Sequence, residues 1–151
     1  MRQCLDMNRG SGARLAHTFY LSLLMDIYVR QRRPEDAQRV RDEAMATVGD
    51  TGERFWLAEL HRLGGELELI GGTSEARARA ERAFSLAIET ARTHGARSLE
   101  LRAAMSLGRI LTANGKRMDA HHHLSTAYSH FTDGFETPDL QNARVLLDAW
   151  A

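Results

Sequence analysis

The chain has 151 residues, 20 of them basic and 20 acidic, and a single cysteine, Cys4. A chain of this length suits one domain with a real hydrophobic core, and balanced charge without a basic block argues against nucleic acid or an anionic membrane as the main partner. One cysteine excludes an intrachain disulfide, and the apolar runs are too short to cross a bilayer. We expect a soluble protein of the reducing cytoplasm, without a signal peptide at its start.

Helical spacing of apolar residues, together with many good helix formers, predicts an all-α protein. Glycines such as Gly49, Gly95 and Gly115 are placed to end helices, and Pro34 and Pro138 suit first turns. The predicted helices cover, in chain order, residues 14–32, 34–48, 51–70, 73–94, 98–114, 116–131 and 138–150. Seven helices with short connections predict antiparallel neighbours.

Hydroxyl residues mark two of the predicted helix starts. Thr73 or Ser74 follows a glycine pair and can cap the fourth helix through its side-chain oxygen. Thr137 stands directly before Pro138 and is expected to cap the last helix in the same way.

Small residues recur at a fixed spacing along the chain. Three helices carry alanines seven residues apart, which lie on one face, two turns apart. The pairs are Ala37 and Ala44, Ala80 and Ala87, and Ala120 and Ala127. The helix before each carries two large residues four apart, the first followed by Met25, Gly64 or Gly108. Helices approach closely at small residues, and one helix pair cannot bury its apolar face alone, so the units are expected to stack.

This pattern resembles the tetratricopeptide repeat. Unit three, residues 96–132, matches best, and unit two, residues 51–95, matches with one insertion at residues 71–74. Unit one, residues 11–49, carries Met25 and Arg41 where a small and a large apolar residue are usual. The units recur about every 40 residues rather than about every 34. The resemblance implies one domain over residues 1–151, a right-handed α-solenoid of about three repeats with a capping helix at 137–150.

Three further stretches resemble one bacterial group more closely. They are residues 51–63, 96–104 and 131–140. The group is the C-terminal tetratricopeptide region of multidomain signalling ATPases, many of which carry a class III adenylate or guanylate cyclase domain. There the repeats sense partners or regulate the protein itself. The resemblance therefore leaves two functions open, an interaction module for a separate partner and a regulatory arm acting in cis.

The resemblance places a binding surface on the concave face, lined by the first helix of each unit. The groove positions carried over are Ser22, Asp26, His61, Arg62, Glu68, Arg102, Met105 and Arg109. Arginines one or two turns apart can hold a carboxylate or phosphate bidentately, and ordinary surface charge is the competing interpretation. The lysine and asparagine clamp of chaperone-binding relatives is not matched, so we do not predict chaperone binding.

Catalytic chemistry finds little support in the residues. No phosphate-binding loop and no metal-binding motif occurs, and Gly10-Ser11-Gly12 lacks the strand, turn and helix that a nucleotide site needs. His121, His122 and His123 are consecutive, so on a helix they point in different directions and cannot chelate one ion together. We therefore predict no enzyme, no cofactor and no metal, with a metal-dependent enzyme using His122 or His123 as the least favoured alternative.

The sequence thus predicts a non-catalytic protein-interaction module that binds a peptide or a partner domain. Trp56 and Trp150 fit the apolar stripes and are expected in the core rather than as partner anchors. Pairing of two chains through edge repeats is left open, because no residue demands it.

Overall fold

The computed structural model describes residues 16–151, and this part of the chain consists of helices and their connections. Cys4, the Gly10-Ser11-Gly12 segment and the start of the first predicted unit lie outside the described residues. Seven helices are described: α2 (His17–Arg30), α3 (Pro34–Thr51), α4 (Leu57–Leu69), α5 (Ser74–Thr93), α6 (Arg97–Ala113), α7 (Arg117–Tyr128) and α8 (Pro138–Trp150). The all-α prediction is confirmed for these residues.

The helix ends follow the predicted glycines with one correction. Gly95 and Gly115 adopt the left-handed conformation, with φ of 64° and 77°, two residues after the last residues of α5 and α6. The prediction that the second helix ends at Gly49 is wrong, because α3 continues to Thr51 and ends at Gly52, whose φ is 70°. Glycine inside a helix costs only about 1 kcal/mol of stability relative to alanine, so Gly49 does not end α3. The helix ends at Gly52 because the backbone turns left-handed there.

The third predicted helix begins later than expected. Residues from Thr51 were assigned to it, but α4 starts at Leu57. Glu53 in the intervening connection accepts a hydrogen bond from the Thr18 hydroxyl of α2. The N–H of Leu57 donates to the carbonyl of Arg54 at 3.1 Å. The connection is therefore held by a tertiary contact that helical periodicity does not show.

One of the two capping predictions is confirmed. The backbone N–H of Ala76 donates to the Thr73 hydroxyl at 3.1 Å, so Thr73 caps α5. Thr137 precedes α8 as expected but makes no capping bond, and its hydroxyl donates to the carbonyl of Gly134 at 2.8 Å. The prediction of a Thr137 side-chain cap is wrong.

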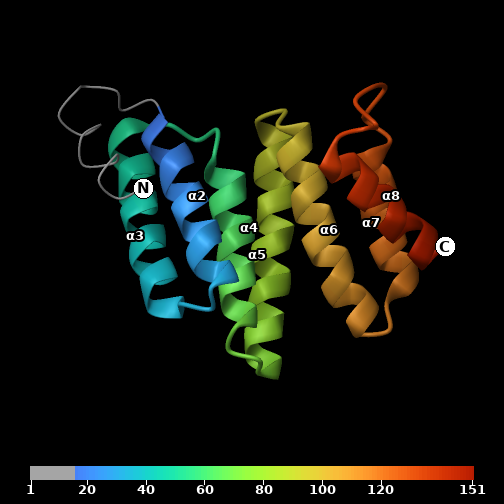
Figure 1. The fold of residues 1–151 in the computed structure, drawn as a ribbon, viewed down its shortest axis with the longest axis horizontal. Coiled ribbons are helices and arrows are strands. Elements are labelled where there is room, and N and C mark those ends of the chain that lie inside the picture. The colour runs from blue at the N-terminus through green and yellow to red at the C-terminus, as the bar shows by residue number, and fades with distance from the viewer. Residues whose placement is uncertain (1–15) are drawn as a thin grey trace.

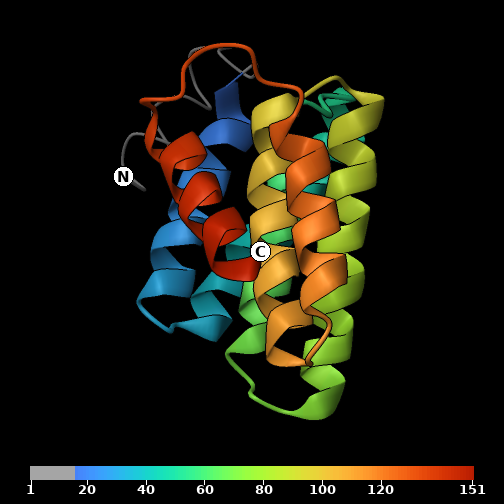
Figure 2. The same ribbon diagram turned by 90° about the vertical axis from the view of Figure 1, so that its right-hand side faces the viewer.

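Consecutive helices run antiparallel, and the helix pairs α2–α3, α4–α5 and α6–α7 follow one another across the molecule, with α8 beside the last pair (Figure 1). In addition, every second helix contacts the next one but one: α2 contacts α4, α4 contacts α6, and α6 contacts α8. Figure 2 shows α2 and α8 standing on the same side of α4 and α6. These four helices therefore form one face of the molecule.

The core confirms the predicted alanine faces. Six alanines at the seven-residue spacing are 0–1% exposed: Ala37, Ala44, Ala80, Ala87, Ala120 and Ala127. One apolar cluster joins α2, α3 and α4, and a larger one joins α5, α6, α7 and α8. Trp150 is buried in the larger cluster, and α8 packs against both α6 and α7. Within the described part, no helix combines the length and apolar character needed to cross a membrane.

Candidate interaction groove

The face formed by α2, α4, α6 and α8 holds a groove of about 560 Å³. It is lined by Phe19, Ser22, Leu23, Asp26, Arg30, Trp56, Glu59, Arg62, Arg102, Met105, Ser106, Arg109, Asp139 and Asn142. Charged side chains occupy its centre and aromatic ones one end. Residues from four helices far apart in the sequence therefore share one surface.

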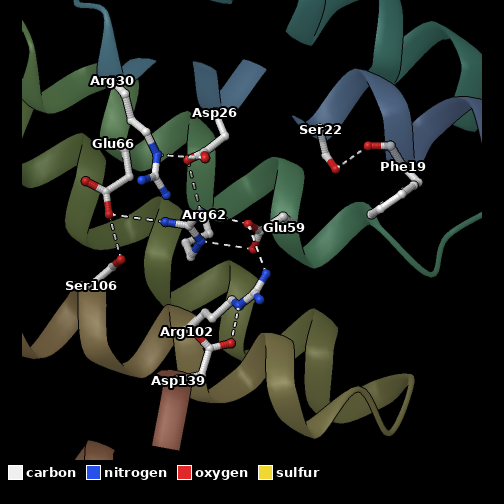
Figure 3. Close-up of polar contacts among 10 residues, drawn as sticks. All are labelled: Phe19, Ser22, Asp26, Arg30, Glu59, Arg62, Glu66, Arg102, Ser106 and Asp139. Atoms are coloured by element: carbon white, nitrogen blue, oxygen red, sulfur yellow. Dashed lines mark hydrogen bonds and ion pairs between the residues drawn. The ribbon is translucent and has the colours of Figure 1, made fainter. Parts of the chain in front are cut away.

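Arg62 of α4 is the centre of the groove's polar network (Figure 3). Its Nε and Nη2 donate to the two carboxylate oxygens of Glu59 at 2.9 and 2.7 Å, a bidentate pair one turn apart on the same helix. Its Nη1 lies 3.4 Å from Oε1 of Glu66, and its Nη2 lies 4.0 Å from Oδ1 of Asp26. The guanidinium thus links α4 to α2.

Glu59 and Arg62, the bidentate pair at the centre of the groove, are both largely buried. Glu59 is 6% exposed, and the Arg62 side chain is 13% exposed. Burial alone would lower the pKa of the Arg62 guanidinium, but the hydrogen bond and charge of Glu59, followed by the charges of Glu66 and Asp26, raise that pKa above its usual range. Arg62 therefore stays charged and is held in place.

Two further contacts join α6 and α8 to this network (Figure 3). The Ser106 hydroxyl of α6 donates to Oε1 of Glu66 at 2.6 Å. Arg102 of α6 donates from Nε to Oδ2 of Asp139 in α8 at 2.6 Å, and its Nη1 lies 3.9 Å from Oε1 of Glu59. The network therefore spans all four helices, and Arg102 is already engaged by carboxylates of the protein itself.

An aromatic pair lies at one end of the groove. The rings of Phe19 in α2 and Trp56 before α4 have centroids 4.6 Å apart. Leu23, on the same helix as Phe19, is 37% exposed and also lines the groove. This end offers apolar surface beside the charged centre, an arrangement that suits side chains of a bound polypeptide. Trp56, expected in the core, is only partly buried.

Most of the residues carried over from the repeat resemblance lie in this groove. Those that line it are Ser22, Asp26, Arg62, Arg102, Met105 and Arg109. Two do not. His61 is partly buried and lies within reach of the positive charge of Arg41 in α3, and Glu68 accepts a hydrogen bond from Arg79 of α5 at 2.7 Å. Both lie on α4 about 100° or more around the helix axis from Arg62, and in this packing neither lines the groove.

Other groove residues were missed in the sequence. Glu59 and Glu66 stand three before and four after Arg62, and this spacing of opposite charges was a usable signal for a helical ion-pair cluster. Asp139 had no such signal. Its carboxylate reaches Arg102 only because α8 folds back onto α6.

No protein-family model, curated protein or solved structure matches the chain. The functional inference therefore depends on the geometry of the groove and on the repeat pattern in the residues.

The three consecutive histidines lie on α7, away from the groove. The rings of His122 and His123 have centroids 6.0 Å apart, and His122 is exposed. Burial, with the positive charges of His122 and Arg92, lowers the pKa of His123. Within residues 16–151 no cluster of three histidine, cysteine or carboxylate side chains is arranged to hold a metal ion.

His61 gives a pH-dependence that can be measured. Burial, and then the positive charge of Arg41, lowers the pKa of His61 below its ordinary value. The folded state then binds fewer protons than the unfolded state, so stability is full above the unfolded value of about 6.5 and falls as the pH drops through the lowered folded value. His61→Gln removes this titration. We expect the melting temperature of the wild type to fall more steeply than that of H61Q between about pH 7.5 and about pH 5.

The comparison uses the slopes of melting temperature against pH for the wild type and H61Q, not the melting temperatures themselves. All other histidines are common to both proteins, so their contribution cancels in the difference. Melting curves that stay parallel across this pH range would show that His61 is solvated equally in the folded and unfolded states.

Proposed function

We propose that this chain is a tetratricopeptide-like α-solenoid that binds an extended segment of a partner protein in the groove formed by α2, α4, α6 and α8. The observation that supports it most directly is that the groove is lined by the first helix of each helix pair and by the last helix. This is the surface that the repeat resemblance implies for binding. Three antiparallel pairs, with buried alanines at the repeat spacing, support the solenoid itself.

The chemistry of the groove also favours binding of a polypeptide. Its central charges are paired with one another across four helices, which fixes the shape of the surface before any partner arrives. Exposed apolar and polar side chains, including Leu23 and Asn142, remain beside that rigid centre. A preorganised surface with apolar and hydrogen-bonding groups side by side suits a peptide.

Blocking the groove tests this proposal without touching the core. Asn142 is exposed on α8 and lines the groove, whereas its neighbour Gln141 is exposed and does not line it. We expect Asn142→Trp to weaken peptide binding by about tenfold or more, equivalent to about 1.4 kcal/mol, because the indole occupies the groove. The matched variant Gln141→Trp should leave affinity within about twofold, since both substitutions add the same surface indole.

The probe is a displayed library of random peptides of about a dozen residues, longer when extended than the roughly 30 Å across four packed helices. Peptides enriched by the wild type are synthesised, and their dissociation constants are measured by fluorescence anisotropy for the wild type and both variants. Circular dichroism confirms that the variants fold. No enrichment by the wild type, or equal affinities for N142W and Q141W, would overturn the proposal.

A regulatory arm acting in cis is the second candidate. The three stretches that resemble signalling ATPases and cyclases lie at or next to the α3–α4, α5–α6 and α7–α8 connections, and these connections lie at the same end of the helices (Figure 1). One edge could thus contact a neighbouring domain while the groove remains free. An in-frame upstream coding region for an ATPase or cyclase domain in the source genome supports this candidate, and a stop codon directly upstream excludes it.

A further inference from the structure

A second hollow, of about 420 Å³, continues from the groove toward the α4–α5 turn. Ser106 and Arg109 of α6 line both spaces, so the two are contiguous. The second hollow adds side chains from α4 and α5, and it is lined by Glu66, Leu69, Arg77, Ser106, Arg109, Ile110, Ala113 and Asn114. A segment lying in the groove can therefore extend into this hollow without leaving the surface.

Two arginines in the hollow are uncommitted. Arg77 and Arg109 are both exposed, and neither guanidinium group makes a hydrogen bond or an ion pair with another residue in 16–151. The nearby arginines differ, since Arg62, Arg79 and Arg102 each donate to a carboxylate. Two guanidinium groups facing one hollow thus retain their capacity to bind an anion.

The hollow's own carboxylate does not supply that anion. Oε1 of Glu66 already accepts the Ser106 hydroxyl at 2.6 Å and lies 3.4 Å from Nη1 of Arg62. Arg102 lies two turns from Arg109 on α6, but Asp139 engages Arg102. The free arginine that shares a hollow with Arg109 comes instead from α5, at Arg77.

Apolar side chains form the rest of this surface. Leu69 is partly buried, Ile110 is 6% exposed, and Ala113 lies one turn further along α6. An exposed ion pair alone contributes little binding free energy, so an isolated anion would bind weakly in this hollow. An acidic side chain beside an aliphatic one would use both features, because burial of the aliphatic group excludes water from the ion pair.

We propose that this hollow selects partner segments that carry an internal glutamate or aspartate next to an aliphatic residue, with Arg77 and Arg109 holding the carboxylate. The inference depends on the proposed function, since it names the chemistry of the segment that the groove binds. Lysine or arginine at the same place in the segment is repelled by the two guanidinium groups.

The test uses the same random peptide library and then matched peptides. An enriched acidic peptide is compared with its own version in which the glutamate or aspartate is replaced by glutamine or asparagine. We expect the wild type to bind the acidic form about fivefold tighter or better. In the double variant R77Q/R109Q this ratio should fall to about one. The double variant R82Q/R144Q, which removes the same charge from exposed positions on α5 and α8 outside this hollow, should keep the wild-type ratio.

The outcomes separate the two proposals. Peptides enriched without any preference for acidic residues, or an acid preference that survives in R77Q/R109Q, would overturn this inference and leave the interaction module in place. Loss of the preference in R82Q/R144Q as well would overturn it too, because net charge would then account for the effect. A wild type that enriches no peptide would overturn both.

Discussion

Replacing Arg62 with methionine is expected to lower the free energy of unfolding by about 3 kcal/mol. Glu59 is 6% exposed and takes two of its hydrogen bonds from the Arg62 guanidinium. Methionine leaves that carboxylate buried, and among residues 16–151 the cation that remains paired with it is Arg102, whose Nη1 lies 3.9 Å from Oε1. An uncompensated buried charge is what makes the loss of one partner so destabilising. Urea denaturation followed by circular dichroism measures the effect, with unchanged m-values showing that the same transition is compared.

Two companion variants separate burial from charge. E59Q/R62M removes both charges and should recover at least about half of the lost stability, because no buried ion remains to be desolvated. Arg30→Met removes another guanidinium that donates to a carboxylate, Asp26, but its side chain is 77% exposed, so we expect a change of about 0.5 kcal/mol or less. An R62M protein as stable as R30M would contradict the view that Arg62 and Glu59 form a buried pair.

The Arg62 network shows which parts of the groove can be predicted from sequence. Glu59, Arg62 and Glu66 lie on one helix, so their spacing alone indicates the interaction. Asp26 and Asp139 join from other helices, and their distances to the arginines depend on how α2 and α8 pack. Local periodicity contains no information about that packing, which is why Asp139 was missed.

Helix rotation explains the two groove residues that the structure places elsewhere. Consecutive residues on a helix differ by about 100° around its axis, so the rotation of α4 that turns Arg62 into the groove leaves His61 outside the groove lining. The sequence predicts the helices and which of their residues are apolar, although α4 begins later than predicted, and the buried alanines confirm the apolar faces. Packing against neighbouring helices sets the rotation of each helix about its axis. That rotation determines which polar residues, on either side of the apolar stripe, face the groove.

The close contact between α4 and α5 also differs from the sequence pattern in an instructive way. The repeat alignment pairs Gly64 with Gly108 as the small residue of each first helix, but the side chain nearest Gly64 is Arg41 of α3. Gly65 is the residue that α5 approaches: a Cβ placed there would lie 2.5 Å from Cε1 of Phe84. Gly108 approaches Trp150 of α8 instead of the second helix of its own pair. Each of these glycines thus lies close to a side chain of another helix, but that helix is α3, α5 or α8 according to the glycine.

Gly65→Ala is therefore expected to destabilise the protein by about 1–2 kcal/mol, although alanine favours a helix over glycine by up to about 1 kcal/mol. A Cβ at this position would lie within 2.9 Å of three Phe84 ring atoms, and Phe84 is 0% exposed, so the ring has no solvent side to move into. Overpacking of a filled core then outweighs the gain in helix propensity. Urea denaturation gives the free energy directly.

Gly49→Ala provides the opposite case on α3. A Cβ there has no atom within 4 Å, and Gly49 lies inside the helix near its end. With no steric conflict only the propensity term remains, so G49A should stabilise the protein by about 0.5 kcal/mol or more. The same substitution should therefore change stability with opposite sign at the two sites. If G65A stabilised the protein as G49A does, the Phe84 ring would have to shift readily, and the close approach of α4 and α5 could not depend on the missing side chain at Gly65.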